Sequence, residues 1–251
     1  MTQAPAVPPS TLEERLKRTL VPPRLELKRI VARELKKGEP GLKLVPLLVD
    51  PKRAALDIGA NRGIWAHEMA RFTSAVLAFE PNPKLFTVLQ RAAKKPVLCR
   101  PEALSDADGE AELLIPGQGV RFSNQGASLN PDKVGEAAHM RVTVKTAALD
   151  HLDPPPIGFM KIDVEGHERA VLDGARGVIA RDRPTLIIEI EERHTGKDID
   201  SELDHVESLG YRTLVLARGQ LIDRARFDPE RDHRALAGQP GYANNFVFLP
   251  V

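Results

Sequence analysis

The sequence predicts an α/β fold built around a parallel sheet, because from Ala54 onward short apolar runs alternate with segments of helical periodicity. Hydrophobic residues make up 42% of the 251 residues, which is enough to bury a large core, so we expect most of the chain to be ordered. No apolar run approaches the roughly 18 residues that span a bilayer. The single cysteine, Cys99, can form no disulfide within the chain, which favours a reducing, cytoplasmic location.

The charged residues divide the chain into two parts. Residues 1–53 carry 12 basic and 6 acidic side chains, whereas residues 54–251 carry 24 basic and 29 acidic ones. We therefore expect an N-terminal helical extension over 1–53 and a main domain over 54–251. The net charge of +1 and the 4% of aromatic residues argue against a nucleic-acid partner, which would call for a basic surface and stacking rings.

The N-terminal extension is expected to hold two helices. Ser10 and Thr11, each followed three residues later by a glutamate, form overlapping capping boxes that predict a helix beginning near Leu12. Pro22-Pro23 ends that helix and starts the second one, for which Gly38 is a C-cap candidate.

The second helix of the extension is amphipathic. Its apolar face holds Leu27, Ile30, Val31 and Leu35. Its other face holds Lys28, Arg29, Arg33, Lys36 and Lys37. A basic face of this kind can bind anionic lipid or an acidic partner, and it can equally be the solvated side of a helix packed against the main domain.

In the main domain the pattern predicts a series of strands and helices, with one interruption. The expected strands are 54–57, 75–80, 96–100, 159–163, 185–190, 211–216 and 244–249. The expected helices are 61–72, 83–93, one that bears Val171 to Ile179, and 201–209. A β-hairpin with a long polar loop is expected as an insertion over 110–146, with strands at 111–115 and 140–145. Long polar loops inside compact domains are usually functional or mobile.

The first motif follows the first expected strand and reads Asp57-Ile58-Gly59-Ala60-Asn61-Arg62-Gly63. Gly59 and Gly63 allow a tight turn and a close approach of the backbone to a ligand. The helix that follows points free N–H groups and its positive dipole end toward the same place. The strand–glycine turn–helix pattern therefore predicts a ligand site at the end of the strand.

The second motif, Phe79-Glu80-Pro81, ends the next strand. An acidic residue about 20 positions after the glycine turn is placed to accept hydrogen bonds from ribose hydroxyls. The G-x-G-x-x-G fingerprint is absent, and the Asp57 carboxylate would repel a pyrophosphate. A cationic nucleoside such as S-adenosylmethionine fits the pattern better than NAD, which a nicotinamide dehydrogenase would bind.

The third motif is an acidic cluster at the end of the strand 159–163. Asp163, Glu165, His167 and Glu168 lie within six positions, at the edge where open α/β sheets bind ligands. Taken alone, Asp163 could simply form a turn, and Glu168 could complement a helix dipole. Next to the other two motifs, the cluster favours a reacting centre.

These motifs occur in a fixed order that resembles a known family. The sequence holds Asp57-Ile58-Gly59-Ala60-Asn61-Arg62-Gly63, Phe79-Glu80-Pro81-Asn82-Pro83, Ala103-Leu104-Ser105-Asp106 with Gly109, Lys161-Ile162-Asp163-Val164-Glu165-Gly166-His167-Glu168 and Ile188-Glu189-Ile190-Glu191. Over roughly residues 54–249 it resembles the FkbM family of S-adenosylmethionine-dependent methyltransferases. The resemblance implies the class I methyltransferase fold, a Rossmann-like, doubly wound, seven-stranded sheet whose last strand is antiparallel. It also implies O-methylation of a hydroxyl on a sugar, a glycan or a secondary metabolite.

The resemblance also implies roles for particular residues. The methionine end of the cofactor would be held by Asp57, Gly59, Asn61 and Gly63, and the ribose by Glu80 with Pro81 beside it. The adenine would be bordered by Ala103, Leu104 and Ser105. Asp163, which would also contact the cofactor, and Glu165 would face the reacting centre.

Methyl transfer to a hydroxyl is helped by a general base, for which the sequence leaves several candidates open. His167 and His194 have a suitable ordinary pKa, and Asp163 or Glu165 could serve if neighbouring groups raised the pKa of the carboxyl. Asp163 with Glu189 or Glu191 could instead hold a divalent cation, although nothing in the spacing requires a metal.

One alternative function and several properties also stay open. The alternative is a non-catalytic cofactor-binding module that its basic helix docks to a membrane or an acidic partner. The expected acceptor is a small molecule or a glycan. Its identity, the role of residues 1–53 and the oligomeric state, a homo-oligomer included, are not encoded in any motif.

Overall fold

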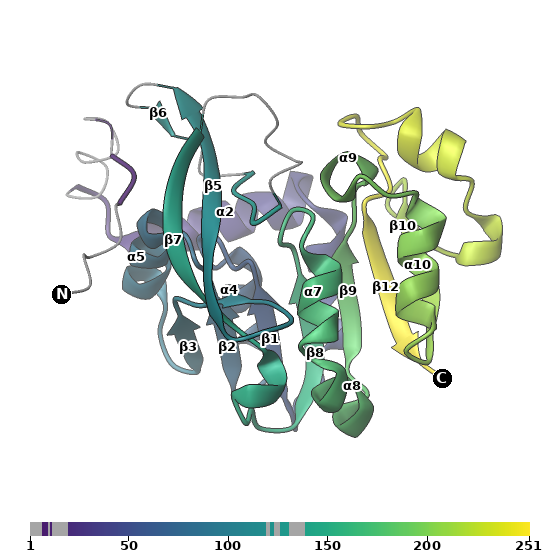
Figure 1. Ribbon diagram of the computed structural model, residues 1–251, viewed down its shortest axis with the longest axis horizontal. Coiled ribbons are helices and arrows are strands. Elements are labelled where there is room, and N and C mark those ends of the chain that lie inside the picture. The colour runs from purple at the N-terminus through teal and green to yellow at the C-terminus, as the bar shows by residue number, and fades with distance from the viewer. Residues whose placement is uncertain (1–6, 10, 12–19, 119–120, 123–125, 131–138) are drawn as a thin grey trace.

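The computed structural model describes residues 7–9, 11, 20–118, 121–122, 126–130 and 139–251 (Figure 1). The helix predicted to begin near Leu12 lies outside the described residues. None of the helices in the described ranges has both the length and the apolar character of a membrane span.

The main sheet has eight strands in the order β11-β10-β12-β9-β8-β1-β2-β3. They are β1 Ala54–Ile58, β2 Val76–Phe79, β3 Val97–Arg100, β8 Ile157–Ile162, β9 Thr185–Glu189, β10 Tyr211–Ala217, β11 Gln220–Asp223 and β12 Asn245–Pro250. The strands from β3 to β9 are parallel, and β12 runs antiparallel between β9 and β10. The doubly wound, methyltransferase-like sheet with an antiparallel last strand is confirmed.

The expected number of seven strands needs one correction. The eighth strand, β11, forms a hairpin with β10 at the edge of the sheet. Because its residues are mostly exposed, β11 lacks the apolar run that marks the other strands in the sequence.

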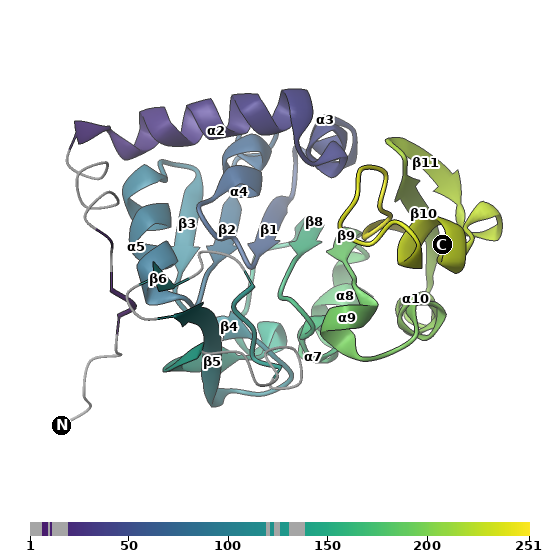
Figure 2. The same ribbon diagram turned by 90° about the horizontal axis from the view of Figure 1, so that it is seen from above.

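Helices cover both faces of the main sheet (Figure 2). On one face lie α2 Pro23–Lys37, η1 Pro40–Leu44, α3 Val45–Leu48, α4 Ile64–Met69 and α5 Pro83–Ala92. On the other lie α7 Glu168–Asp173, α8 Arg176–Asp182 and α10 Ile199–Glu207. Shorter elements are η2 Leu149–His151, α9 Glu192–Thr195, η3 Arg224–Arg226 and the π-helical turn η4 Pro229–Arg234.

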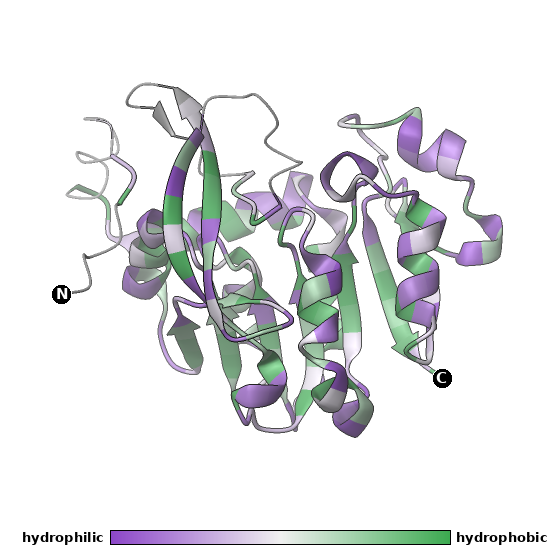
Figure 3. Ribbon diagram, in the orientation of Figure 1, coloured by the Kyte–Doolittle hydropathy of each residue, from purple (hydrophilic) through white to green (hydrophobic). Residues whose placement is uncertain are grey.

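Alternating side chains of the strands fill two cores, one on each face. Leu56 and Ile188 pack with residues of α7, α8 and α10, whereas Ala55 and Ile187 pack with Trp65 and other residues of α3 and α4. Both faces are buried, so the central strands are hydrophobic along most of their length (Figure 3). This is why they stand out in the sequence as continuous apolar runs.

One predicted helix is divided in two. The apolar periodicity from Val171 to Ile179 predicts one helix, but α7 ends at Asp173 and α8 begins at Arg176. The carbonyl of Gly174 accepts from the Asp150 N–H at 2.9 Å. A Cβ on Gly174 would lie 1.9 Å from the carbonyl oxygen of Ser105. A contact distant in sequence therefore fixes the break.

The insertion forms a second sheet of four strands, in the order β4-β7-β5-β6. Strands β5 Gly109–Gln118 and β7 His139–Ala147 pair antiparallel, β4 Ala103–Leu104 pairs with β7, and β6 Arg121–Phe122 pairs with β5. Leu114 also bridges to Ser128 in the following loop. This bridge brings part of the insertion back over the carboxyl edge of the main sheet.

Helix α2 packs against the main domain through its apolar face. Leu27 and Val31 are buried and contact Ala92 of α5, and Gly38 caps the helix with its N–H bonded to the Glu34 carbonyl. The five basic residues of α2 predicted to share a face are all exposed.

Candidate functional site

A cavity of about 560 Å³, here called the main cavity, opens at the carboxyl ends of the parallel strands β1, β2, β8 and β9. Open α/β sheets bind ligands at this edge. Ten of the residues singled out in the sequence line it: Gly59, Asn61, Glu80, Pro81, Ala103, Leu104, Asp163, Glu165, His167 and His194. The insertion adds Gly126, Ala127, Ser128 and Leu129 to the wall.

The glycine turn forms one wall of the main cavity. Gly59 has a φ of +82°, and a Cβ there would lie 1.8 Å from the carbonyl oxygen of Asp163. Gly63, with a φ of +84°, is the left-handed residue from which α4 begins. Asn61 also has a positive φ, +52°. The backbone after β1 therefore lies so close to the backbone after β8 that only a residue without a side chain fits at position 59.

Asp57 lies beneath this wall and is not among the residues that line the main cavity. Its side chain is 2% exposed, and its Oδ2 accepts from the Ala66 N–H at 2.7 Å. Burial raises its pKa to about 7, against the effect of that hydrogen bond. The carboxylate therefore holds the first turn of α4. Gly63 and Ser105 likewise lie outside the lining.

Glu80 connects the glycine turn to the end of β2. One carboxylate oxygen accepts from the Asn61 N–H at 2.7 Å, and the other accepts from the Asn82 N–H at 2.8 Å. Burial raises the pKa of Glu80 to about 7. Because each carboxylate oxygen has a second lone pair, Glu80 can still accept from a ligand in the cavity.

A lysine that sequence reasoning missed underlies the main cavity. Lys161 is fully buried, and its Nζ lies 3.7 Å from Asp163 Oδ2, 3.8 Å from Glu189 Oε2 and 5.4 Å from the centroid of the Trp65 ring. Burial opposes its charge, but the surrounding carboxylates, Asp163 first among them, raise the pKa of Lys161. The available signal was a lysine inside an otherwise apolar strand.

Asp163 and Glu189 are two of the carboxylates that the sequence offered as a possible site for a divalent cation. The Lys161 ammonium already contacts both carboxylates. Burial raises the pKa of Glu189 well above its usual range. In the described ranges, no group of three or more His, Cys, Asp or Glu side chains is arranged to hold a metal ion.

His194 and Glu165 form a pair in the wall of the main cavity. The Nδ1 of His194 lies 2.9 Å from Glu165 Oε2, and the two side chains are 12% and 24% exposed. Glu191, also in the wall, is bound by the Arg193 guanidinium and by the Tyr242 hydroxyl. With Nδ1–H donated to Glu165, the ring nitrogen that can accept a proton is Nε2.

His167 is in a different setting. Its Nε2 lies 2.9 Å from the Ser105 hydroxyl, which in turn donates to Asp106 Oδ1 at 3.0 Å. Burial lowers the pKa of His167, and the Asp106 charge opposes the shift only in part. The chain of hydrogen bonds ties the loop after β8 to the end of β4.

The insertion is fastened to the loop that carries Glu165. Ser128 Oγ donates to the Glu165 carbonyl at 2.6 Å, and Asn130 Nδ2 donates to the His194 carbonyl at 2.8 Å. A Cβ on Gly166 would lie 2.3 Å from that same His194 carbonyl oxygen. These contacts hold the His194–Glu165 pair under the insertion.

Glu39 lines the main cavity and is another residue that sequence reasoning missed. It comes from the N-terminal extension, and its Oε2 accepts from the Trp65 indole N–H at 3.1 Å. Burial raises the pKa of Glu39. The signal was a glutamate before Pro40 in an otherwise basic segment.

Comparison with known proteins places these features in a family. Residues 57–213 match the model of the methyltransferase FkbM domain. No curated protein matches the chain. Among solved structures, methyltransferase FkbM from Methylobacillus flagellatus KT is 14% identical, with a TM-score of 0.49 over 93% of this chain and 60% of that one. This chain therefore spans less than two thirds of the length of the Methylobacillus protein.

Two other solved structures resemble the chain at similar levels. A TehB-like S-adenosylmethionine-dependent methyltransferase from Corynebacterium glutamicum is 12% identical, with a TM-score of 0.46 over 90% of this chain and 96% of that one. Magnesium protoporphyrin IX methyltransferase from Synechocystis PCC 6803, determined with bound S-adenosylmethionine, is 11% identical, with a TM-score of 0.40 over 96% and 86%.

The residues of the main cavity fit the methyl donor that this family uses. The tight turn at Gly59 and Asn61 lines the cavity, and Glu80 offers buried carboxylate oxygens beside it. The described lining includes seven acidic residues and, among arginines and lysines, Arg193 alone, so the cavity favours a cationic ligand. The chain belongs to the FkbM family of S-adenosylmethionine-dependent methyltransferases.

Proposed function

We propose that the protein is an O-methyltransferase that methylates a hydroxyl of a sugar, a glycan or a secondary metabolite. The observation that carries the proposal is the His194–Glu165 pair, which lines the main cavity with 2.9 Å between Nδ1 and Oε2. A hydroxyl is a poor nucleophile while it is protonated, and a carboxylate-oriented imidazole is suited to remove that proton. When bound, the cofactor supplies a methyl group on a positively charged sulfur.

Several lining residues would hold the cofactor. Glu80 would accept from the ribose hydroxyls, with Pro81 beside it, and the turn at Gly59 and Asn61 would receive the methionine end. Ala103 and Leu104 would border the adenine. Asp57 and Gly63 would act from below by fixing the start of α4, and Ser105 by orienting His167.

The structure favours His194 over His167 as the general base. His194 Nδ1 is paired with a carboxylate, which stabilises the imidazolium that forms when Nε2 takes a proton. His167 instead contacts a neutral hydroxyl, and its pKa is lowered by burial. Asp163 would remain beside the reacting centre as an electrostatic partner, since it contacts the buried Lys161.

The test combines binding with turnover. Calorimetry should show binding of S-adenosylhomocysteine, and Glu80→Gln should weaken it about tenfold or more, because a charged hydrogen-bond acceptor contributes roughly 1.5–3 kcal/mol. Labelled S-adenosylmethionine should then transfer its methyl group to members of a panel of hydroxylated glycans and phenols. No heat from either nucleoside with the wild-type protein would overturn the cofactor assignment.

The base is tested with matched histidine variants. His194→Gln should lower kcat about 100-fold or more while leaving S-adenosylhomocysteine affinity unchanged. His167→Gln should have a much smaller effect, and His151→Gln, which changes an exposed histidine, should have none. A larger loss for His167→Gln than for His194→Gln would reverse the assignment. Binding without turnover on any acceptor would favour the alternative of a non-catalytic module docked through the basic face of α2.

A further inference from the structure

A second cavity adjoins the main cavity. Its volume is about 810 Å³, within the range of small-molecule sites, roughly 300–1,000 Å³. Two of its lining residues, Glu39 and Glu189, also line the main cavity, so these two carboxylates stand in the wall that the cavities share. A ligand in the second cavity would therefore lie next to the proposed methyl donor.

The walls of the second cavity come from parts of the chain outside the family match. Apart from Glu189, its lining residues belong to 37–40, from the end of α2 onward, and to 216–245, from the end of β10 to the start of β12. The match to the family covers 57–213. Cofactor binding is what family members share, whereas acceptors differ among methyltransferases. The part of the chain beyond the match is therefore where an acceptor site is expected.

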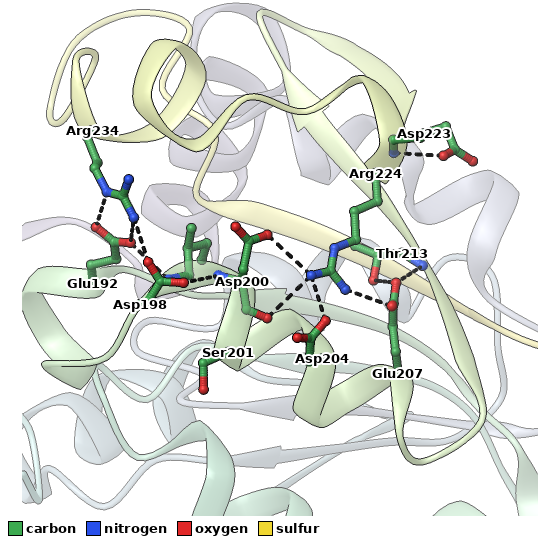
Figure 4. A network of polar contacts seen from close by, with 12 residues as sticks. Glu192, Asp198, Asp200, Ser201, Asp204, Glu207, Thr213, Asp223, Arg224 and Arg234 are labelled. Carbon is green, nitrogen blue, oxygen red and sulfur yellow. Dashed lines mark hydrogen bonds and ion pairs between the residues drawn. The ribbon is translucent and has the colours of Figure 1, made fainter.

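The segment between β10 and β12 is held in place by ion pairs (Figure 4). Arg234 of η4 donates to Glu192 of α9 and to Asp198 before α10. Arg224 of η3 bonds to Glu207 and Asp204 of α10. These contacts fix η3 and η4, which connect the two stretches of chain that line the second cavity, against the main domain.

The lining of the second cavity mixes polar and apolar groups, and its charges balance. Its charged residues are two basic, Lys37 and Arg218, and two acidic, Glu39 and Glu189. Amide side chains and the backbone of four glycines supply both donors and acceptors. An uncharged ligand with several hydroxyls, each of which both donates and accepts, matches this surface.

One side chain in the lining has an unmet hydrogen bond. Asn245 is 4% exposed and lines the cavity, and within the described ranges its Oδ1 has no hydrogen-bond partner. Its Nδ2 donates to Asn244 Oδ1 at 3.2 Å, and Asn244 Nδ2 donates to Glu189 Oε1 at 2.9 Å. Burial of a polar atom without a partner is unfavourable, so this amide keeps unused hydrogen-bonding capacity in the wall of the cavity.

We infer that the second cavity is the acceptor site and that it selects uncharged, polyhydroxylated acceptors of the sugar class. This inference rests on the proposed O-methyltransferase function. Asn244 and Asn245 are the specificity residues. They hold the acceptor beside Glu189 in the shared wall, past which its reacting hydroxyl extends into the main cavity toward the His194–Glu165 pair.

The test uses the full-length protein saturated with S-adenosylhomocysteine. The probes are the methyl glycosides of glucose, galactose, mannose and rhamnose, with the methyl glycoside of glucuronic acid as an anionic comparison. Binding is followed by ligand-observed NMR. We expect one or more of the uncharged glycosides to bind at least tenfold more tightly than the uronide.

Three variants localise the binding. Gln239→Trp places a large ring on an exposed residue that lines the second cavity, and Gln220→Trp makes the same change on exposed β11, outside that lining. Gln239→Trp should weaken glycoside binding about tenfold or more, whereas Gln220→Trp should match the wild type. Asn245→Leu should have a similar effect to Gln239→Trp. All three should keep S-adenosylhomocysteine affinity within twofold.

The outcomes separate this inference from the function on which it rests. Failure of the wild type to bind S-adenosylhomocysteine would overturn the proposed function. Nucleoside binding with no glycoside binding, tighter binding of the uronide, or unchanged glycoside binding in Gln239→Trp would each overturn the acceptor assignment alone.

Discussion

Around Lys161 the molecule buries its charges, whereas around Arg224 and Arg234 it leaves them near the surface. Lys161 is fully buried between two carboxylates at 3.7 and 3.8 Å, and the Arg234 side chain is 39% exposed with carboxylates at 2.7 and 2.8 Å. The buried charges have displaced pKa values and underlie the main cavity. The surface charges tie the C-terminal segment to α9 and α10. Shorter contacts therefore do not mean larger contributions to stability, because solvent decides what each pair is worth.

The largest effect is expected for Lys161→Met. Removing the ammonium deletes the buried positive charge beside Asp163 and Glu189, so the free energy of unfolding should fall by about 3 kcal/mol at neutral pH. Urea denaturation measures it, with the exposed Lys145→Met as control. A loss below about 1 kcal/mol would show that the buried cluster is no more costly to disturb than the surface one.

The second prediction concerns pH. Burial raises the pKa of Glu168 to about 7, above its ordinary 4.5, so the folded state holds this proton more tightly than the unfolded state. Its contribution to stability is full below about pH 4.5 and is lost as the pH rises through 7. Between pH 5 and pH 8, the free energy of unfolding of Glu168→Gln should therefore rise by about 2 kcal/mol relative to that of the wild type. Free energies of unfolding that change in parallel with pH in the two proteins would contradict the raised pKa of Glu168.

An intermediate effect is expected for Arg224→Gln. This side chain is 21% exposed and contacts carboxylates of Asp200, Asp204 and Glu207, so the loss should be about 1 kcal/mol. Thermal unfolding of the variant is compared with that of Arg212→Gln, which changes an exposed arginine of β10. A loss as large as that of Lys161→Met would remove the contrast between the two regions.

The smallest effect is expected for Arg234→Gln. Its exposed pairs should contribute about 0.5 kcal/mol in low salt and almost nothing in 1 M NaCl, where charges are screened beyond about 3 Å. Urea denaturation at the two salt concentrations measures the difference. A loss that persists in 1 M NaCl would mean that Arg234 acts through packing.

The sequence predicted the main sheet well, because its strands are buried on both faces and appear as apolar runs between turns. It did not predict β11, whose residues are exposed and pair only with the neighbouring β10. Nor did it predict the break between α7 and α8, since the contact of Gly174 with Ser105 joins residues 69 positions apart. Local patterns carry no information about such contacts.

The candidate site was likewise predicted only in part from the sequence. Glu80, Glu165 and the glycine turn were found because each follows a strand, where a short motif meets the sheet edge. The pairing of His194 with Glu165 could not be read from spacing, because it depends on the fold bringing two strand ends together. The second cavity was missed altogether, since glycine, proline and asparagine in a loop look the same whether or not they surround a ligand.

The contact between Gly59 and the Asp163 carbonyl bears on how this protein can be engineered. Any side chain at position 59 would collide with the Asp163 carbonyl just after β8 and would also adopt a φ that only glycine accepts readily. In a saturation library that samples every position, codons for the other nineteen amino acids at 59 should vanish under selection for turnover. The extent of that depletion would show, within the same screen, how strongly a variant without any activity is depleted.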